Sequence, residues 1–189
     1  RGGGERGEDV TANARRISNV PFELEWEGDC HIRGEVVMPL ATFNEKYADV
    51  APNPRNLAAG ALRQKHIEKG KAKAEHLEFY AYDVRFVGSK HRHPDSPEPD
   101  FMESDSQATK WLVEQGITVA GDEIVEGEND EDTSDSMIAL TRLYTENREK
   151  YDWEIDGIVF KLDNFAKRKL LGMTAHHPRW ALAWKFPPD

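Results

Sequence analysis

The sequence predicts an α+β fold with mainly antiparallel sheets and flanking helices. Strand-like and helical segments are mixed along the chain, but without the regular alternation that is typical of a parallel sheet. Two strand-like segments are separated only by a Gly28-Asp29 turn, which indicates a local hairpin. With 189 residues, of which 38% are apolar, the chain can form one domain with a real core or two small domains.

Helical segments are recognised by their periodicity and by polar residues or prolines at their starts. They are expected at residues 8–18, 39–50, 53–64, 104–116 and 134–150, followed by a short basic helix that ends at Leu171. Ser104 or Asp105 is expected to cap the fourth of these helices, and Gly116 is expected to end it. Residues 126–135, just before the long helix, are interpreted as a solvated acidic loop.

Strands are recognised by alternating or short continuous apolar segments. The hairpin is expected over residues 22–37, with Phe22, Leu24 and Trp26 on one face and a return strand that begins at Cys30. Further strands are expected at residues 77–87, 157–161 and 180–186, with a short one after Gly116. The charged segment 65–76 and the proline-rich segment 88–103 are interpreted as connections.

The composition limits the possible functions. A net charge of −10 argues against a uniformly basic nucleic-acid surface, but two basic clusters could still bind phosphate locally. Their members are Arg63, Lys65, Lys69, Lys71 and Lys73 in the first, and Lys161, Lys167, Arg168, Lys169, Arg179 and Lys185 in the second. The single cysteine, Cys30, excludes an internal disulfide and a cysteine-based zinc cluster within this chain. No apolar segment is long enough to span a bilayer, and we expect a cytoplasmic protein that is part of a longer chain.

The segment Glu154–Lys161 combines acids, a glycine and a short apolar stretch that ends on a lysine. It predicts a buried strand from Gly157 with Lys161 at its end, and both Glu154 and Asp156 on one side. A lysine at the end of an apolar strand is rarely buried without a partner. The alternative is an edge strand with a solvated Lys161.

Three predicted strand ends carry charge beside glycine or proline. They are Arg33-Gly34-Glu35, Asp156-Gly157 with Lys161, and the closing segment with Lys185. In the closing segment, Ala181 and Ala183 share a face with Lys185 and leave room for a flat ligand. On the predicted helix 53–64, Arg55 and Arg63 lie about two turns apart and so share a face.

Together these residues predict an anionic phosphate ligand, with a metal ion possible at Glu35 or Asp156. Taken one at a time, each is more simply explained as an ordinary surface or core-strand residue. Metal sites at His91-Arg92-His93 or His176-His177 are less favoured, because neither histidine pair has a third ligand in its pattern. The glycine-rich start, Arg1 to Gly7, could bind phosphate or simply be flexible.

The order of the motifs resembles the NAD-dependent DNA ligases of bacterial type. The resemblance covers nearly the whole chain and rests on Arg1-Gly2-x-Gly4-x-x-Gly7-Glu8-Asp9-Val10-Thr11, Arg33-Gly34-Glu35-Val36, Asn53-Pro54-Arg55-Asn56-x-Ala58-Ala59-Gly60-x-Leu62-Arg63-Gln64, Glu154-Ile155-Asp156-Gly157-Ile158-Val159-x-Lys161 and Arg179-Trp180-Ala181-x-Ala183-x-Lys185-Phe186-Pro187. It implies an adenylation domain with a nucleotidyltransferase, ATP-grasp-like fold.

The family joins nicked duplex DNA in DNA replication and repair, with NAD as the source of AMP and magnesium assisting. The resemblance implies that Lys161 and Lys185 neutralise the AMP phosphate and that Asp156 orients Lys161 or a metal-bound water. It implies nucleotide contact by Arg1, ribose or metal contact by Glu35, and adenine packing by Tyr82, which could equally be a core tyrosine. Arg55 and Arg63 would hold DNA phosphates, and the enzyme would act as a monomer.

Several parts of the family pattern do not occur in this sequence. The nucleophilic lysine belongs to a Lys-x-Asp-Gly motif, which is expected upstream of Arg1, so this chain alone is expected to be inactive. The OB, zinc-finger, helix-hairpin-helix and BRCT domains of the family are expected downstream, which makes residues 1–189 a partial adenylation domain. Gly3 replaces the usual aspartate, and residues 65–76 differ from the common bacterial sequence. Two alternatives remain: an ATP-dependent ligase or capping-type nucleotidyltransferase, and a non-catalytic remnant that binds DNA or a partner.

Overall fold

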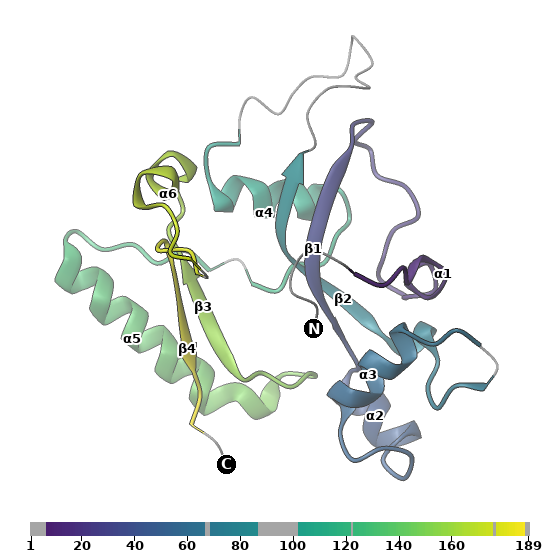
Figure 1. Cartoon of the computed structure of the whole chain (residues 1–189). Helices are drawn as coiled ribbons and strands as arrows, with labels where there is room; N and C mark the ends of the chain where they lie inside the picture. Colours follow the sequence, from purple (N-terminus) through teal and green to yellow (C-terminus); the bar gives the residue numbers. More distant parts are fainter. Residues whose placement is uncertain (1–6, 67–68, 87–101, 122, 176, 188–189) are drawn as a thin grey trace.

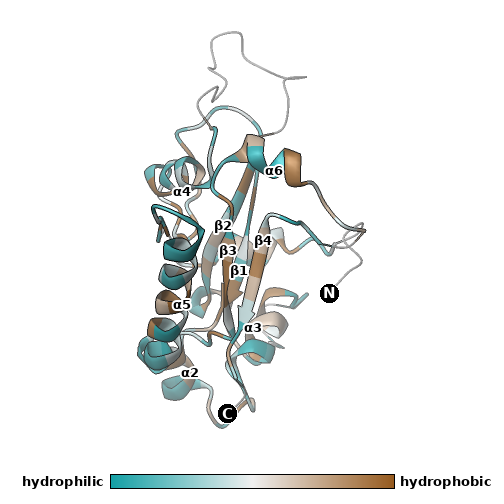
Figure 2. Cartoon of the chain, turned by 90° about the vertical axis from the view of Figure 1, so that its left-hand side faces the viewer, coloured by the Kyte–Doolittle hydropathy of each residue, from teal (hydrophilic) through white to brown (hydrophobic). Residues whose placement is uncertain are grey.

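Two small antiparallel sheets form the framework of the protein (Figure 1). The computed structural model describes residues 7–66, 69–86, 102–121, 123–175 and 177–187. The first sheet pairs β1 (Cys30–Val37) with β2 (Glu78–Phe86), and the second pairs β3 (Gly157–Lys161) with β4 (Ala181–Lys185). Helices lie on both sides of the sheets (Figure 2). The described residues therefore agree with the α+β class and the antiparallel pairing.

The predicted hairpin at residues 22–37 is wrong, because only its second half forms a strand. Phe22 is 86% exposed, so the expected apolar face is not buried at its first position. Trp26 instead packs edge-on against Phe86 and Trp111, and its backbone N–H donates to the side chain of Gln115. β1 consequently pairs with β2, which lies more than forty residues later in the chain.

The ladder between β1 and β2 contains a bulge at Tyr82. Arg33 pairs with Asp83 and Gly34 pairs with Ala81, so that Tyr82 has no partner on β1. A Cβ atom on Gly34 would lie 2.3 Å from the carbonyl oxygen of Tyr80, which explains the glycine at this position. A bulge turns one residue out of the regular alternation, and Tyr82 is accordingly 48% exposed. The alternative of a core tyrosine is therefore wrong.

Two buried clusters lie on the β1–β2 half of the molecule. One is formed between β2 and α4 (Asp105–Glu114), and includes Ala81, Val84, Trp111 and Leu112. The other includes side chains of α2 (Leu40–Lys46), of α3 (Pro54–Leu62), and of the segment with η2 (Ala74–His76) that leads into β2. Neither cluster contains a residue of β3 or β4. The first sheet is therefore the packed one.

The second sheet is only half-buried, and the prediction of a buried strand at residues 157–161 is wrong. Val159 on β3, and Leu182 and Trp184 on β4, are each more than half exposed. Among the described residues β3 has β4 as its only paired strand, so one edge and much of each face stay open. The position of the strand itself was predicted correctly.

Most predicted helices are present, with shifted ends. Ser104 caps α4 by accepting from the Gln107 backbone N–H, and Gly116 follows it with a φ of 77°, as expected. α5 (Asp130–Asn147) begins four residues earlier than predicted, because Asn129 caps it and three acids in its first turn interact favourably with the helix dipole. α6 (Phe165–Leu171) matches the predicted basic helix.

The other early helices are shorter than predicted. α1 (Thr11–Ala14) covers only part of residues 8–18, because the chain continues in tight turns whose hydrogen bonds span three residues. α2 ends at Lys46 rather than near Val50, and the amides of Val50 and Ala51 both bond to the Tyr47 carbonyl in a turn. No helix in the described part of the chain has the length and apolar character needed to cross a membrane.

Contacts at residues 144–153 connect the two sheets. The backbone carbonyl and side chain of Asp152 accept hydrogen bonds from the Leu40 and Ala41 amides, which caps the start of α2. The Trp153 ring lies 4.6 Å from Tyr80 on β2, and Tyr151, just after η3 (Arg148–Lys150), stacks on Tyr144 of α5. The segment that leads into β3 is thereby attached to the packed half.

Replacement of Gly34 with alanine is expected to destabilise the protein by about 1–3 kcal/mol, because the new Cβ overlaps backbone and ring atoms of the neighbouring strand. Chemical denaturation measures the change. Gly60→Ala is the matched control, since nothing lies within 4 Å of its Cβ position on α3, and it should stabilise by roughly 0.5–1 kcal/mol. Equal effects of the two substitutions would contradict the bulge geometry.

Candidate functional site

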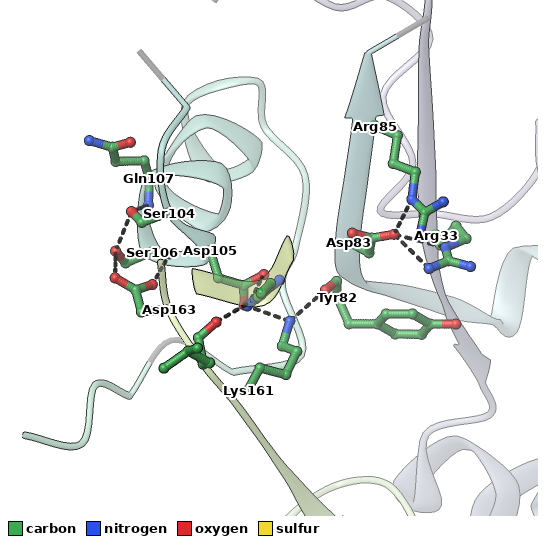
Figure 3. Close-up of polar contacts among 12 residues, drawn as sticks. Arg33, Tyr82, Asp83, Arg85, Ser104, Asp105, Ser106, Gln107, Lys161 and Asp163 are labelled. Carbon is green, nitrogen blue, oxygen red and sulfur yellow. Dashed lines mark hydrogen bonds and ion pairs between the residues drawn. The ribbon is translucent and has the colours of Figure 1, made fainter. Parts of the chain in front are cut away.

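Lys161 is held at the end of β3 by two oxygen atoms from other elements (Figure 3). Its Nζ donates to the backbone carbonyl of Tyr82 at 2.9 Å and pairs with Oδ2 of Asp105 at 2.6 Å. The Lys161 side chain is 26% exposed and that of Asp105 only 18%. The alternative of a freely solvated Lys161 is therefore wrong.

Asp105 also contacts a second cation. Its Oδ1 lies 3.1 Å from Nη2 of Arg168, in an ion pair that lacks hydrogen-bond geometry. The Arg168 side chain is only 10% exposed, with its guanidinium 4.9 Å from the Phe165 ring and 4.3 Å from the Trp180 ring. It also donates through Nε to the Leu162 carbonyl. The guanidinium of Arg168 thus has four neighbours: the Asp105 carboxylate, the two rings and the Leu162 carbonyl.

A separate cluster surrounds Asp156. Nζ of Lys185 lies 3.0 Å from Asp156 Oδ2, and Nη1 of Arg55 lies 3.7 Å from the same atom. The hydrogen bond from Lys185 is the largest cause that lowers the pKa of Asp156, and the charge of Arg55 adds to it. Three residues predicted separately from three segments are therefore brought together. Glu154 and Asp156 are both exposed.

The two lysines lie on one face of the β3–β4 sheet but at opposite ends. Lys161 is paired with Ala181, and Lys185 is paired with Gly157. These two pairs are four residue steps apart along the strands, a distance of about 13 Å. Gly157 allows the close approach of β4, since a Cβ there would lie 2.2 Å from the Trp184 carbonyl oxygen. A common ligand would have to be reached by two long side chains from two ends of the sheet.

The remaining predicted residues are more scattered. Glu35 is exposed on β1 opposite Tyr80, and among the described residues no hydrogen bond or ion pair joins it to Lys161 or Lys185. Arg55 is exposed on α3, and Arg63 is exposed directly after it, 3.9 Å from Glu8. Ala59 and Gly60 between them are also exposed, so the predicted arginine face exists.

Several predictions lie outside the described residues, namely those for Arg1, Gly3, His91, His93 and His176. Within the described part of the chain, no three histidine, cysteine, aspartate or glutamate residues form a group that could hold a metal ion. The carboxylate of Asp156 is paired with Lys185 and Arg55. These two positive charges stabilise the carboxylate but would repel a metal cation.

Sequence reasoning did not find Asp105, Arg168 or the arginine pair on Asp83 as parts of these networks. Asp83 on β2 accepts from Arg33 at 2.9 Å and lies 3.4 Å from Arg85 (Figure 3). Asp105 carried no distinguishing signal, because an acid in the first turn of a helix is common. Arg168 was visible only as one of several basic residues on a short helix.

The whole chain, residues 1–189, matches the family model of the NAD-dependent DNA ligase adenylation domain. The chain belongs to this family. It is 35% identical to the DNA ligases of Psychrobacter arcticus and Shouchella clausii, and 36% identical to that of Anoxybacillus flavithermus. Each alignment covers 100% of this chain but only 26–27% of the relative. The chain therefore spans about a quarter of the length of these relatives.

Membership in the adenylation-domain family confirms the resemblance drawn from the motifs. In this domain, Lys161 and Lys185 each have a carboxylate partner.

The pKa of Asp156 is expected to rise toward its ordinary value of 3.8 in a Lys185→Met variant, because the main stabilising contact to the carboxylate is lost. Carboxyl chemical shifts followed against pH by NMR measure it. Because the native pKa is lowered, the contribution of the pair to stability is present above pH 3.8 and fades as the pH falls through the native pKa.

Arg55→Met is the graded control for this titration. It removes the more distant cation, at 3.7 Å rather than 3.0 Å, and should raise the pKa of Asp156 by less. A larger effect from Arg55 than from Lys185 would contradict the arrangement.

Proposed function

We propose that the complete protein is an NAD-dependent DNA ligase, and that this chain is part of its adenylation domain with a nucleotidyltransferase fold. The observation that supports this proposal most is that Lys161 and Lys185 share one face of the β3–β4 sheet, each paired with a carboxylate. Family membership supports NAD as the adenylate donor over ATP. The complete protein would act on nicked duplex DNA as a monomer in the cytoplasm.

In the proposed reaction, a lysine upstream of this chain attacks the adenylyl phosphorus of NAD, and nicotinamide mononucleotide leaves. The AMP then passes to the 5′-phosphate of the nick, and the 3′-hydroxyl displaces it to form the phosphodiester. Lys161 and Lys185 of this chain would neutralise the phosphate oxygens during these transfers. Asp156 orients Lys185, its direct partner, rather than Lys161, as its contacts indicate.

The nucleotide would lie against the exposed side of the β1–β2 sheet. Tyr82 is turned outward by the bulge and offers a ring for adenine. Glu35 is exposed on the neighbouring strand and is proposed to contact the ribose. Arg1 is proposed to contact the nucleotide from the start of the chain.

Magnesium is proposed as an assisting ion. It is usually held by one or two carboxylates together with substrate phosphates rather than by protein alone. Glu35 is exposed and fits this role, whereas Asp156 is paired with Lys185 and Arg55. We therefore propose Glu35 rather than Asp156 as the residue that contacts the metal ion.

Lys161→Ala in the complete protein is expected to lower nick sealing with NAD by at least about a hundredfold, because the positioned cation for the phosphate is lost. Conversion of a labelled nicked duplex measures it. Lys110→Ala, which removes an exposed lysine of α4, should leave sealing unchanged. Undiminished sealing by Lys161→Ala, or sealing with ATP in place of NAD, would refute the proposed function.

Joint replacement of Arg55 and Arg63 with alanine is expected to reduce the salt dependence of binding to nicked DNA. The slope of log K against log salt should fall by roughly 2, about one for each lost phosphate contact. Fluorescence anisotropy at several salt concentrations measures the slope. Arg142→Ala on α5 is the control with an equally exposed arginine. An unchanged slope in the double variant would show that Arg55 and Arg63 do not contact DNA phosphates.

A further inference from the structure

The ammonium group of Lys161 has three N–H donors, and two of them have partners among the residues that the structure describes. One is directed to the Tyr82 carbonyl and one to Asp105 Oδ2 (Figure 3). These partners come from β2 and from α4, while Lys161 itself lies on β3. Two contacts from two directions fix the direction of the third N–H.

Asp105 is itself held in place by contacts other than the one with Lys161. Its other oxygen faces the guanidinium of Arg168, which is enclosed by two aromatic rings and a backbone carbonyl. Each oxygen of the Asp105 carboxylate therefore faces a positive charge, and the planar guanidinium resists reorientation. Favourable interaction of Asp105 with the dipole of α4 would not require the nearly buried Arg168 beside it in addition to Lys161.

The start of α4 is attached to the rest of the protein independently of Lys161. The Asp105 amide donates to the Asp163 backbone carbonyl, and the Asp163 side chain accepts from the amide and hydroxyl of Ser106 at 2.8 and 3.0 Å. In the described part of the chain, no hydrogen bond or ion pair joins Asp163 to Lys161 (Figure 3). Asp163 therefore holds the start of α4 in place, whereas Asp105 contacts Lys161. A substitution of one acid can be compared with a substitution of the other.

We propose that Asp105 is a positioning residue for Lys161: together with the Tyr82 carbonyl it directs the remaining N–H of Lys161 toward the adenylate phosphate. This inference rests on the proposed function. It adds a residue on α4 to the groups that govern adenylate transfer, acting only through Lys161.

A positioning role has a distinct kinetic signature. Removal of the Asp105 charge leaves more net positive charge near the phosphate, so attraction for the anionic nucleotide is not reduced. The ammonium becomes free to reorient, and stabilisation that depends on its exact placement in the transition state is lost. A fall in kcat without a rise in KM follows.

The test compares Asp105→Asn with the wild type and with Asp163→Asn in the complete protein. Formation of the enzyme–adenylate from NAD and sealing of a nicked duplex are both measured. For Asp105→Asn we expect kcat to fall roughly ten- to a hundredfold, the loss typical of one hydrogen bond to a charged group, with KM for NAD unchanged or lower. Asp163→Asn, which loosens the same helix start, should stay within about threefold of the wild type.

Three outcomes would overturn the inference: an unchanged kcat in Asp105→Asn, a raised KM with kcat intact, or an equal fall in both variants, since the last would indicate only a displaced helix. An inactive wild type would refute the proposed function itself. An active wild type with an unaffected Asp105→Asn would refute the positioning role alone.

Discussion

The pairing of β1 with β2, with its bulge at Tyr82, is the constraint on which the other parts depend. The regular part of the ladder buries one face of β2 against α4 and so forms one of the two cores. At the bulge Tyr82 has no partner residue on β1, and its carbonyl accepts the hydrogen bond from Lys161. The β1–β2 sheet thereby supplies both one core and the backbone partner of Lys161.

The two carboxylates that face the lysines have different physical settings. Asp105 is 18% exposed and lies between Lys161 and the nearly buried Arg168, so exchange of its partners would leave charge in a poorly hydrated position. Asp156 is 62% exposed and lies between Lys185 and Arg55, where water can replace either contact at little cost. Lys161 therefore has a fixed geometry, whereas Lys185 can exchange its carboxylate partner for water.

Local sequence signals predicted local features. The alternation at residues 180–186 correctly predicted β4 (Ala181–Lys185) and the face of the strand on which Lys185 lies. The cap of α4 at Ser104 and the glycine that follows the helix were predicted from single residues. Contacts between segments far apart in the sequence could not be predicted in this way. The pattern of Phe22, Leu24 and Trp26 is typical of a strand, but the Trp26 ring packs edge-on against Phe86 and Trp111. Asp105 was missed for the same reason, because its partner lies on another element.

The second sheet adds no residue to either buried cluster, so its place beside the first depends on contacts at its ends. At one end these are the contacts of Lys161, and at the other the Trp153–Tyr80 packing, the Asp152 cap of α2 and the Lys185–Asp156–Arg55 group. The ion pairs of the exposed Lys185–Asp156–Arg55 group each contribute little free energy, whereas the contacts of Lys161 are partly buried. The second sheet is therefore held beside the first by local contacts at its two ends rather than by a shared core.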